Sequence, residues 1–128
     1  MIKSSLLIFL LVIASLNDGY SQQNLPYDTL KISSAQELNF AFTYKRGIET
    51  TGGIIYYVEK DLRTLAAYEK GKLKWKTDII KGCGERVIGI PEIRFIKLEN
   101  DKIYIVFGKH SFADVHRSDG KLNCLGAD

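Results

Sequence analysis

Apolar and polar residues alternate along much of the chain after residue 36. Leu38, Phe40, Phe42 and Tyr44 are separated by single residues, the period of two that marks a strand with one buried face. The run Ile54–Val58 is apolar on both faces, which predicts a central strand. Further short strands, separated by turn-forming residues, are predicted at 64–69, 72–79, 93–98, 102–107, 112–116 and 121–125.

Helical patterns are weak by comparison. One helical turn is predicted at 34–38, where Ser34 and Glu37 match the spacing of a capping box. The segment 22–36 is mainly polar and contains Pro26, so we predict a lead-in arm rather than a packed element. The sequence therefore predicts an all-β fold, with a single β domain at residues 37–128.

An internal repeat divides this domain into two units. Ile55–Val58 (IYYV) matches Ile103–Val106 (IYIV) at a spacing of 48 residues. With one inserted residue, Gly71–Leu73 then matches Gly120–Leu122. A period of 20 to 50 residues is typical of repeat architectures. We predict two blade-like antiparallel units of four strands each, at about 38–79 and 93–125.

The first unit contains a specific order of residues after its central strand. Ala67-Tyr68-Glu69 is followed by Gly71–Trp75 (GKLKW), and this order resembles the repeat of pyrroloquinoline-quinone-type β-propellers. The second unit has Val115 in place of the alanine and Cys124 in place of the tryptophan. The resemblance implies blade-like sheets, but a closed ring needs at least about four blades and this chain has material for two. We therefore expect an incomplete propeller or a small sandwich, without a cofactor.

The N-terminus has the features of a secretory signal peptide. Lys3 precedes the apolar run Leu6–Leu16, and Gly19 and Ser21 are small residues two apart before Gln22. A helix of these 11 residues would cover only about half of a bilayer core about 30 Å thick. We predict a signal peptide at 1–21, export to the periplasm or the medium, and no membrane span after cleavage.

Export affects the interpretation of the cysteines and of the charge. Outside the cytoplasm two cysteines are more often a disulfide than a catalytic pair, so Cys83 and Cys124 are predicted to be bridged. Removal of Lys3 and Asp18 leaves the net charge at +3. Nucleic-acid binders usually concentrate more basic charge on one face, and we therefore predict no nucleic-acid partner.

Candidate catalytic groups are few. His110 and His116 are the two histidines, and Asp114 would share a strand face with His116 because residues two apart point the same way. A metal would need a third ligand, either His110 or Asp119, and neither spacing is a known signature. Ser111 has no glycine elbow around it. These residues support only an alternative function, a small secreted hydrolase or metal-binding protein that uses His110, Asp114 and His116.

The predicted strand at 72–79 has one charged face and one mainly apolar face. The charged face carries Lys72, Lys74 and Lys76. The alternating positions are Leu73, Trp75 and Thr77, which predicts a tryptophan in the core. The lysines have two interpretations: they keep an open sheet edge from pairing with other chains, or they form a docking stripe for an acidic partner or an anionic surface.

Taken together, these features favour an exported, non-catalytic binding or protein-interaction module, for example an inhibitor or an immunity-type protein. Its contact surface would be the open sheet edges or the three lysines. Open edges also allow self-association. The identity of a partner is not encoded in any recognisable motif.

Overall fold

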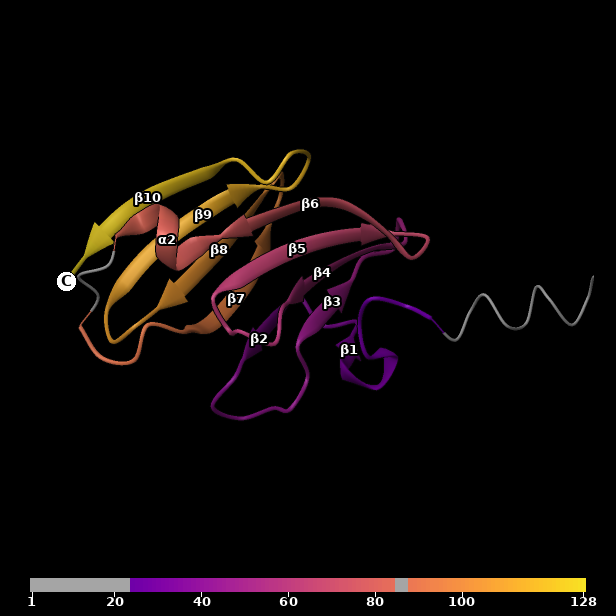
Figure 1. Ribbon diagram of the computed structural model, residues 1–128, viewed down its shortest axis with the longest axis horizontal. Helices are drawn as coiled ribbons and strands as arrows, with labels where there is room; N and C mark the ends of the chain where they lie inside the picture. Colours follow the sequence, from indigo (N-terminus) through magenta and orange to yellow (C-terminus); the bar gives the residue numbers. More distant parts are fainter. Residues whose placement is uncertain (1–23, 85–87) are drawn as a thin grey trace, which may run out of the picture.

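The computed structural model describes residues 24–84 and 88–128, and the predicted signal peptide lies outside them. The strands form two five-stranded sheets (Figure 1). In spatial order, the first sheet contains β1 (Ile32–Ser33), β3 (Gly47–Glu49), β4 (Ile54–Val58), β5 (Thr64–Glu69) and β6 (Lys72–Asp78). The second contains β10 (Leu122–Ala127), β9 (Ser111–His116), β8 (Lys102–Phe107), β7 (Ile93–Glu99) and β2 (Glu37–Asn39). The prediction of an all-β fold is confirmed.

Each sheet is built around a four-stranded antiparallel meander. β3 to β6 form the first meander and β7 to β10 the second, and each sheet gains one further edge strand, β1 or β2. The matching sequences Ile55–Val58 and Ile103–Val106 lie in the second strand of their meanders, β4 and β8. Gly71 and Gly120 both precede the last strand with φ near +75° (76° and 74°), a left-handed conformation that favours glycine. Two four-stranded meanders are therefore present, but the first begins at β3 (Gly47–Glu49) and not at the predicted Leu38.

The predicted strand from Leu38 to Tyr44 is shorter than the sequence pattern suggested. The Asn39 side-chain oxygen accepts a hydrogen bond from the Ala41 backbone N–H (3.0 Å). The Asn39 backbone carbonyl accepts a second hydrogen bond from the Phe42 backbone N–H (2.9 Å). This turn ends β2 at Asn39, so the prediction of a strand through Tyr44 is wrong. β2 pairs with β7 of the second sheet, and the unpredicted strand β3 takes its place in the first.

The prediction of a helical turn at 34–38 is wrong because Glu37 already begins β2. The 3₁₀ turn η1 (Thr29–Lys31) precedes β1, and the helix α2 (Ile79–Cys83) follows β6. The Asp78 carboxylate accepts the Lys81 backbone N–H (2.9 Å), a helix cap that ends the strand predicted to run to residue 79. Within residues 24–84 and 88–128, neither helical segment has the length and apolar composition that a membrane crossing requires.

The N-terminal arm is packed against the first sheet, contrary to the prediction of an unpacked lead-in. Tyr27 and Ile32 contact a buried cluster on the outer face of that sheet, and β1 pairs in parallel with β3. β4 and β5 are consequently covered on both faces, as the apolar run at 54–58 predicted.

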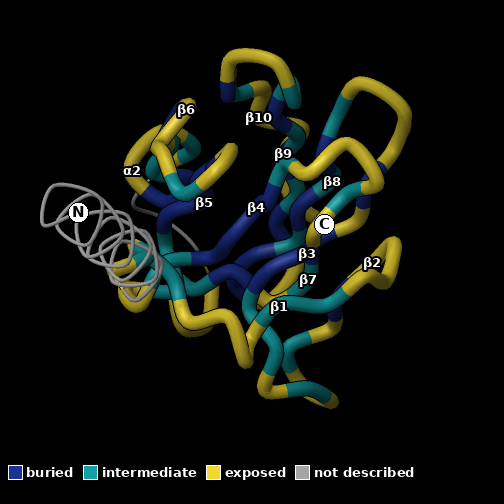
Figure 2. The backbone as a smooth tube through the Cα atoms, turned by 90° about the vertical axis from the view of Figure 1, so that its right-hand side faces the viewer, coloured by how far each residue is buried: buried dark blue, intermediate teal, exposed yellow. Residues whose placement is uncertain are grey.

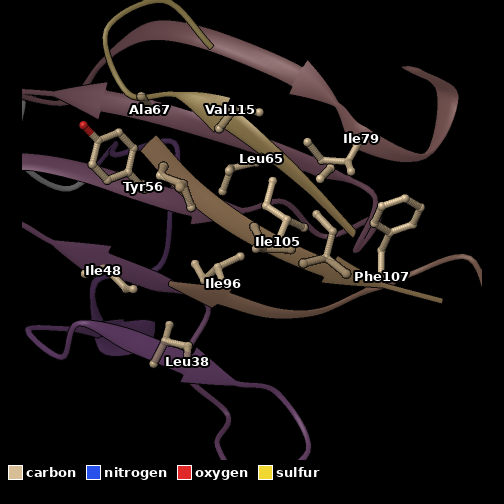
Figure 3. Close-up of a cluster of buried hydrophobic side chains, with 14 of the residues drawn as sticks. Leu38, Ile48, Tyr56, Leu65, Ala67, Ile79, Ile96, Ile105, Phe107 and Val115 are labelled. Atoms are coloured by element: carbon tan, nitrogen blue, oxygen red, sulfur yellow. The ribbon is translucent and has the colours of Figure 1, made fainter. Parts of the chain in front are cut away.

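The main core lies between the two sheets, which pack face to face as a small β-sandwich. Figure 3 shows side chains such as Leu65 of β5 and Ile96 and Ile105 of the second sheet pointing toward one another. All three are fully buried. Figure 2 shows the same distribution along the backbone, with buried residues along the central strands and exposed residues in the connecting loops. Burial of each such side chain contributes about 1.5–3 kcal/mol.

Candidate functional site

The three candidate lysines lie on β6, which is the edge strand of the first sheet. Lys72, Lys74 and Lys76 are all exposed. Leu73, between the first two, is 53% exposed although it is apolar. Among the described residues, no other strand pairs with the free side of β6. This edge thus combines unpaired backbone groups, positive charge and one exposed apolar side chain.

A register shift changes how these side chains are arranged. Trp75 lies opposite Ala67, whereas Leu73 lies opposite Tyr68, so Lys74 is an extra residue in β6. Residues paired across antiparallel strands point to the same face, whereas neighbours in a strand point to opposite faces. Leu73 therefore faces away from the core while Trp75 faces into it, and the prediction that they share an apolar face is wrong.

The lysines consequently do not form one straight stripe. Lys76 lies opposite Ala66 on the outer face of the first sheet, whereas Lys72 lies opposite Glu69 at the end of the β5–β6 hairpin. Lys74 occupies the bulge between them. The positive charge is distributed along the edge of β6, where an approaching strand would meet it.

Trp75 connects this edge to the second sheet. Its side chain is only 8% exposed, and its indole Nε1 donates a hydrogen bond to the Arg117 carbonyl (2.9 Å) in the β9–β10 turn. A Cβ at position 120 would lie 2.4 Å from the indole ring, so Gly120 permits this close approach. The Thr77 hydroxyl donates to the Gly120 carbonyl (2.6 Å). The prediction of a buried Trp75 is confirmed.

Arg117 extends this contact and was not found from the sequence. Its guanidinium lies over the Tyr56 ring, 5.3 Å from the centroid, and its Nε donates to the Tyr56 hydroxyl (3.2 Å). The Tyr56 and Trp75 ring centroids are 6.0 Å apart. Arg117, Tyr56 and Trp75 thus form one stack between the sheets, at the end of the sandwich beside β6.

The predicted disulfide is present. Cys83 at the end of α2 and Cys124 in β10 are bonded, with Cα atoms 5.5 Å apart. Gly82 lies so close to Leu122 that a Cβ there would be 2.3 Å from the leucine Cδ2. The bond ties the chain that leaves β6 to the outer strand of the second sheet, and therefore fixes the position of the β6 edge.

The alternative site at His110, Asp114 and His116 is not assembled. Asp114 and His116 do share the outer face of the second sheet, opposite Tyr104 and Lys102. His110 lies just before β9, at the end opposite His116, and an extended strand of this length separates the two histidines by about 20 Å. Asp119 lies in the next turn, where its carboxylate accepts the Lys121 backbone N–H (2.9 Å). In the part of the chain that the structure describes, no group of three or more histidine, cysteine or acidic residues is placed to hold a metal.

An open cleft beneath the N-terminal arm was not expected. It has a volume of about 860 Å³, and its lining includes Tyr27, Tyr57 and Glu59. Behind it, the Tyr68 hydroxyl donates to Glu59 (2.5 Å), and the rings of Tyr27 and Tyr68 are 5.1 Å apart. Burial raises the pKa of Tyr68, and the bond to Glu59 raises it further; burial also raises the pKa values of Tyr57 and Tyr27. These phenols stay protonated at neutral pH and are packing groups rather than bases.

Neither a known protein family nor a curated protein sequence matches this chain. The resemblance to propeller repeats at Ile55–Trp75 accordingly stays an expectation from the sequence.

Proposed function

We propose that the protein is an exported, non-catalytic binding protein that holds an acidic partner along the free edge of β6. The observation that carries this proposal is an edge strand with exposed lysines at 72, 74 and 76 and an exposed Leu73 between them. Inhibitors and immunity-type proteins, which block another protein by contact alone, belong to this functional class.

A partner strand can add to β6 by pairing with its free backbone N–H and C=O groups. Acidic side chains on that strand would lie beside the three lysines, which accelerates association and disfavours basic competitors. Leu73 supplies an apolar contact at the centre of the charged edge. Main-chain pairing provides the affinity in this arrangement, and the charge selects the partner.

The rigidity of the edge supports the same function. Trp75 and Thr77 bind the β9–β10 turn, and the disulfide follows one helix later. Because the strand is already fixed, little conformational freedom is lost when a partner binds. The disulfide also agrees with an oxidising location outside the cytoplasm, where such bonds persist.

Charge reversal of the edge tests this proposal. The variant Lys72→Glu, Lys74→Glu, Lys76→Glu is compared with Lys60→Glu, Lys97→Glu, Lys109→Glu, which changes the net charge equally at exposed positions away from β6. Binding to a partner purified from the native host is measured by titration calorimetry at several salt concentrations.

The edge variant should bind at least about tenfold more weakly. Its affinity should also depend less on salt, because less electrostatic attraction then remains for salt to screen. The control variant should keep its affinity. Equal losses in both variants, or no loss in the edge variant, would contradict the proposal. Far-UV circular dichroism verifies that both variants are folded.

A further inference from the structure

A second exposed surface lies between β2 and β3, on the loop of residues 40–46 (FAFTYKR). Phe42 is 87% exposed and Tyr44 is 68% exposed. Leu30 of η1, which is 75% exposed, belongs to the same surface because the Lys45 ammonium donates a hydrogen bond to the Leu30 carbonyl (2.9 Å). Three large apolar side chains are therefore held in water near one another, and we call them the apolar tip.

The loop that carries this tip is fixed by local hydrogen bonds. The Asn39 turn determines its start, as described above, and the Thr43 hydroxyl accepts the Lys45 backbone N–H (3.1 Å). At its end, the Arg46 guanidinium lies over the Phe40 ring, 5.0 Å from the centroid. Exposure of the apolar tip is thus imposed by the fold, and large exposed apolar groups of this kind mark interaction sites.

The segments that carry the tip contain only basic charge, although Lys31 and Arg46 also line the cleft that contains Asp28 and Glu59. Lys31, Lys45 and Arg46 are the charged residues of segments 29–31 and 40–46, and neither segment contains an acidic residue. The Asp28 carboxylate, just before η1, is engaged by the Leu30 backbone N–H (3.0 Å). The Lys45 ammonium lies 5.2 Å from the centre of the Tyr44 ring. Aromatic and aliphatic groups are therefore bordered by cations.

We propose that this surface docks onto an anionic lipid membrane. Phe42 and Leu30 would enter the boundary between headgroups and acyl chains, and Tyr44 would lie at headgroup level, where amphipathic aromatic rings are enriched. Lys31, Lys45 and Arg46 would contact headgroup phosphates, since basic residues beside an apolar anchor are attracted by anionic lipids. The anchor is interfacial and involves no membrane-spanning segment.

The shape of the loop favours a lipid surface over a protein partner. Phe42 stands between the small residues Ala41 and Thr43 on a loop that projects from the sandwich (Figure 1). Lipids can close around such a projection, whereas a protein would need a pocket of matching shape. β6 lies on the opposite side of the molecule in both views (Figures 1 and 2), so membrane contact leaves the lysine edge accessible.

Vesicle flotation tests this proposal with the full chain produced in an exporting host. The wild type is compared with Phe42→Ser, Tyr44→Ser, using vesicles of phosphatidylcholine alone or mixed with phosphatidylglycerol. Ile88→Ser, Ile90→Ser is the control, because these two isoleucines are about equally exposed outside the loop. All variants have the same N-terminus, so any contribution of that segment cancels in the comparison.

The wild type should bind the mixed vesicles, and binding should weaken as salt is added. The loop variant should bind them at least about tenfold more weakly, whereas the control should keep its affinity. Lys31→Gln, Lys45→Gln should weaken binding to the mixed vesicles only. Failure of the wild type to bind mixed vesicles, equal binding by the loop variant, or an equal loss in the control would overturn the proposal. The proposal would also be overturned if the loop variant no longer bound a protein partner while the wild type did not bind vesicles.

Discussion

Replacement of Trp75 by alanine should destabilise the protein more than any change at the neighbouring lysines. The indole is 8% exposed and lies between Tyr56 and the β9–β10 turn. Removal of a buried large aromatic side chain typically costs about 3–5 kcal/mol of unfolding free energy. The part-buried Arg117 carbonyl also loses its indole donor, and a fully buried polar group without a partner would cost about 1–3 kcal/mol by itself. Part of this cost is already contained in the first range, so we expect a value in its upper half.

Urea unfolding followed by far-UV circular dichroism measures this effect without relying on the tryptophan. Lys74→Ala should change the unfolding free energy by less than about 0.5 kcal/mol, because its side chain is exposed in the bulge. Trp75→Phe should fall between the two, since it keeps most of the packing and loses the hydrogen bond. A cost below about 1 kcal/mol for Trp75→Ala would refute the reasoning. Red-shifted, solvent-exposed tryptophan emission from the folded wild type would refute it as well.

Four further outcomes are expected. Thiol labelling of the denatured, non-reduced protein should detect no free cysteine, and reduction should lower stability by about 4 kcal/mol, since the bridge closes a loop of about 40 residues. Because the pKa of Tyr68 is raised on folding, its stabilising effect is present below pH 10 and is lost as the pH rises further; Tyr68→Phe should flatten this fall in unfolding free energy above about pH 10. Replacement of His110 and His116 by alanine should change neither partner affinity nor bound metal measured by mass spectrometry, and stoichiometric zinc that disappears in this variant would favour the enzyme alternative. The protein isolated from its native host should begin near Gln22, and an intact mass that includes Met1 would contradict export with cleavage.

Much of the fold follows from local sequence patterns. β4, β5 and β7 to β10 are bounded by turn residues and show the period of two, or an apolar run, that distinguishes strands. The repeat at Ile55–Val58 and Ile103–Val106 predicts the two meanders because equivalent strands need similar side chains to fill equivalent positions.

The errors arise where a side chain or a distant segment overrides the pattern. Alternation through Phe42 and Tyr44 predicts a strand. The Asn39 side chain instead accepts the Ala41 backbone N–H, which forms a turn, and both aromatic side chains are exposed to solvent. The bulge at Lys74 does not change the alternation of polar and apolar residues in the sequence, so the outward position of Leu73 could not be predicted. The partial burial of Tyr27 depends on tertiary packing of a polar arm, which local propensity does not report.

Only part of the candidate site could be predicted from the sequence. Trp75 and the disulfide followed from residue type and the predicted compartment, because a lone tryptophan and a cysteine pair have few alternative roles in a domain that is expected to be exported. Arg117 was missed because its partners, Tyr56 and the Trp75 indole, are far from it in sequence. No short motif reports such a contact.

Amide hydrogen exchange along β6, with and without the bound partner, tests the central claim most directly. If the partner adds a strand to this edge, the β6 amides that point away from β5 should exchange slowly in the complex and rapidly in the free protein. Unchanged exchange along β6, together with new protection elsewhere on either sheet, would contradict the claim that Lys72–Lys76 is the binding surface.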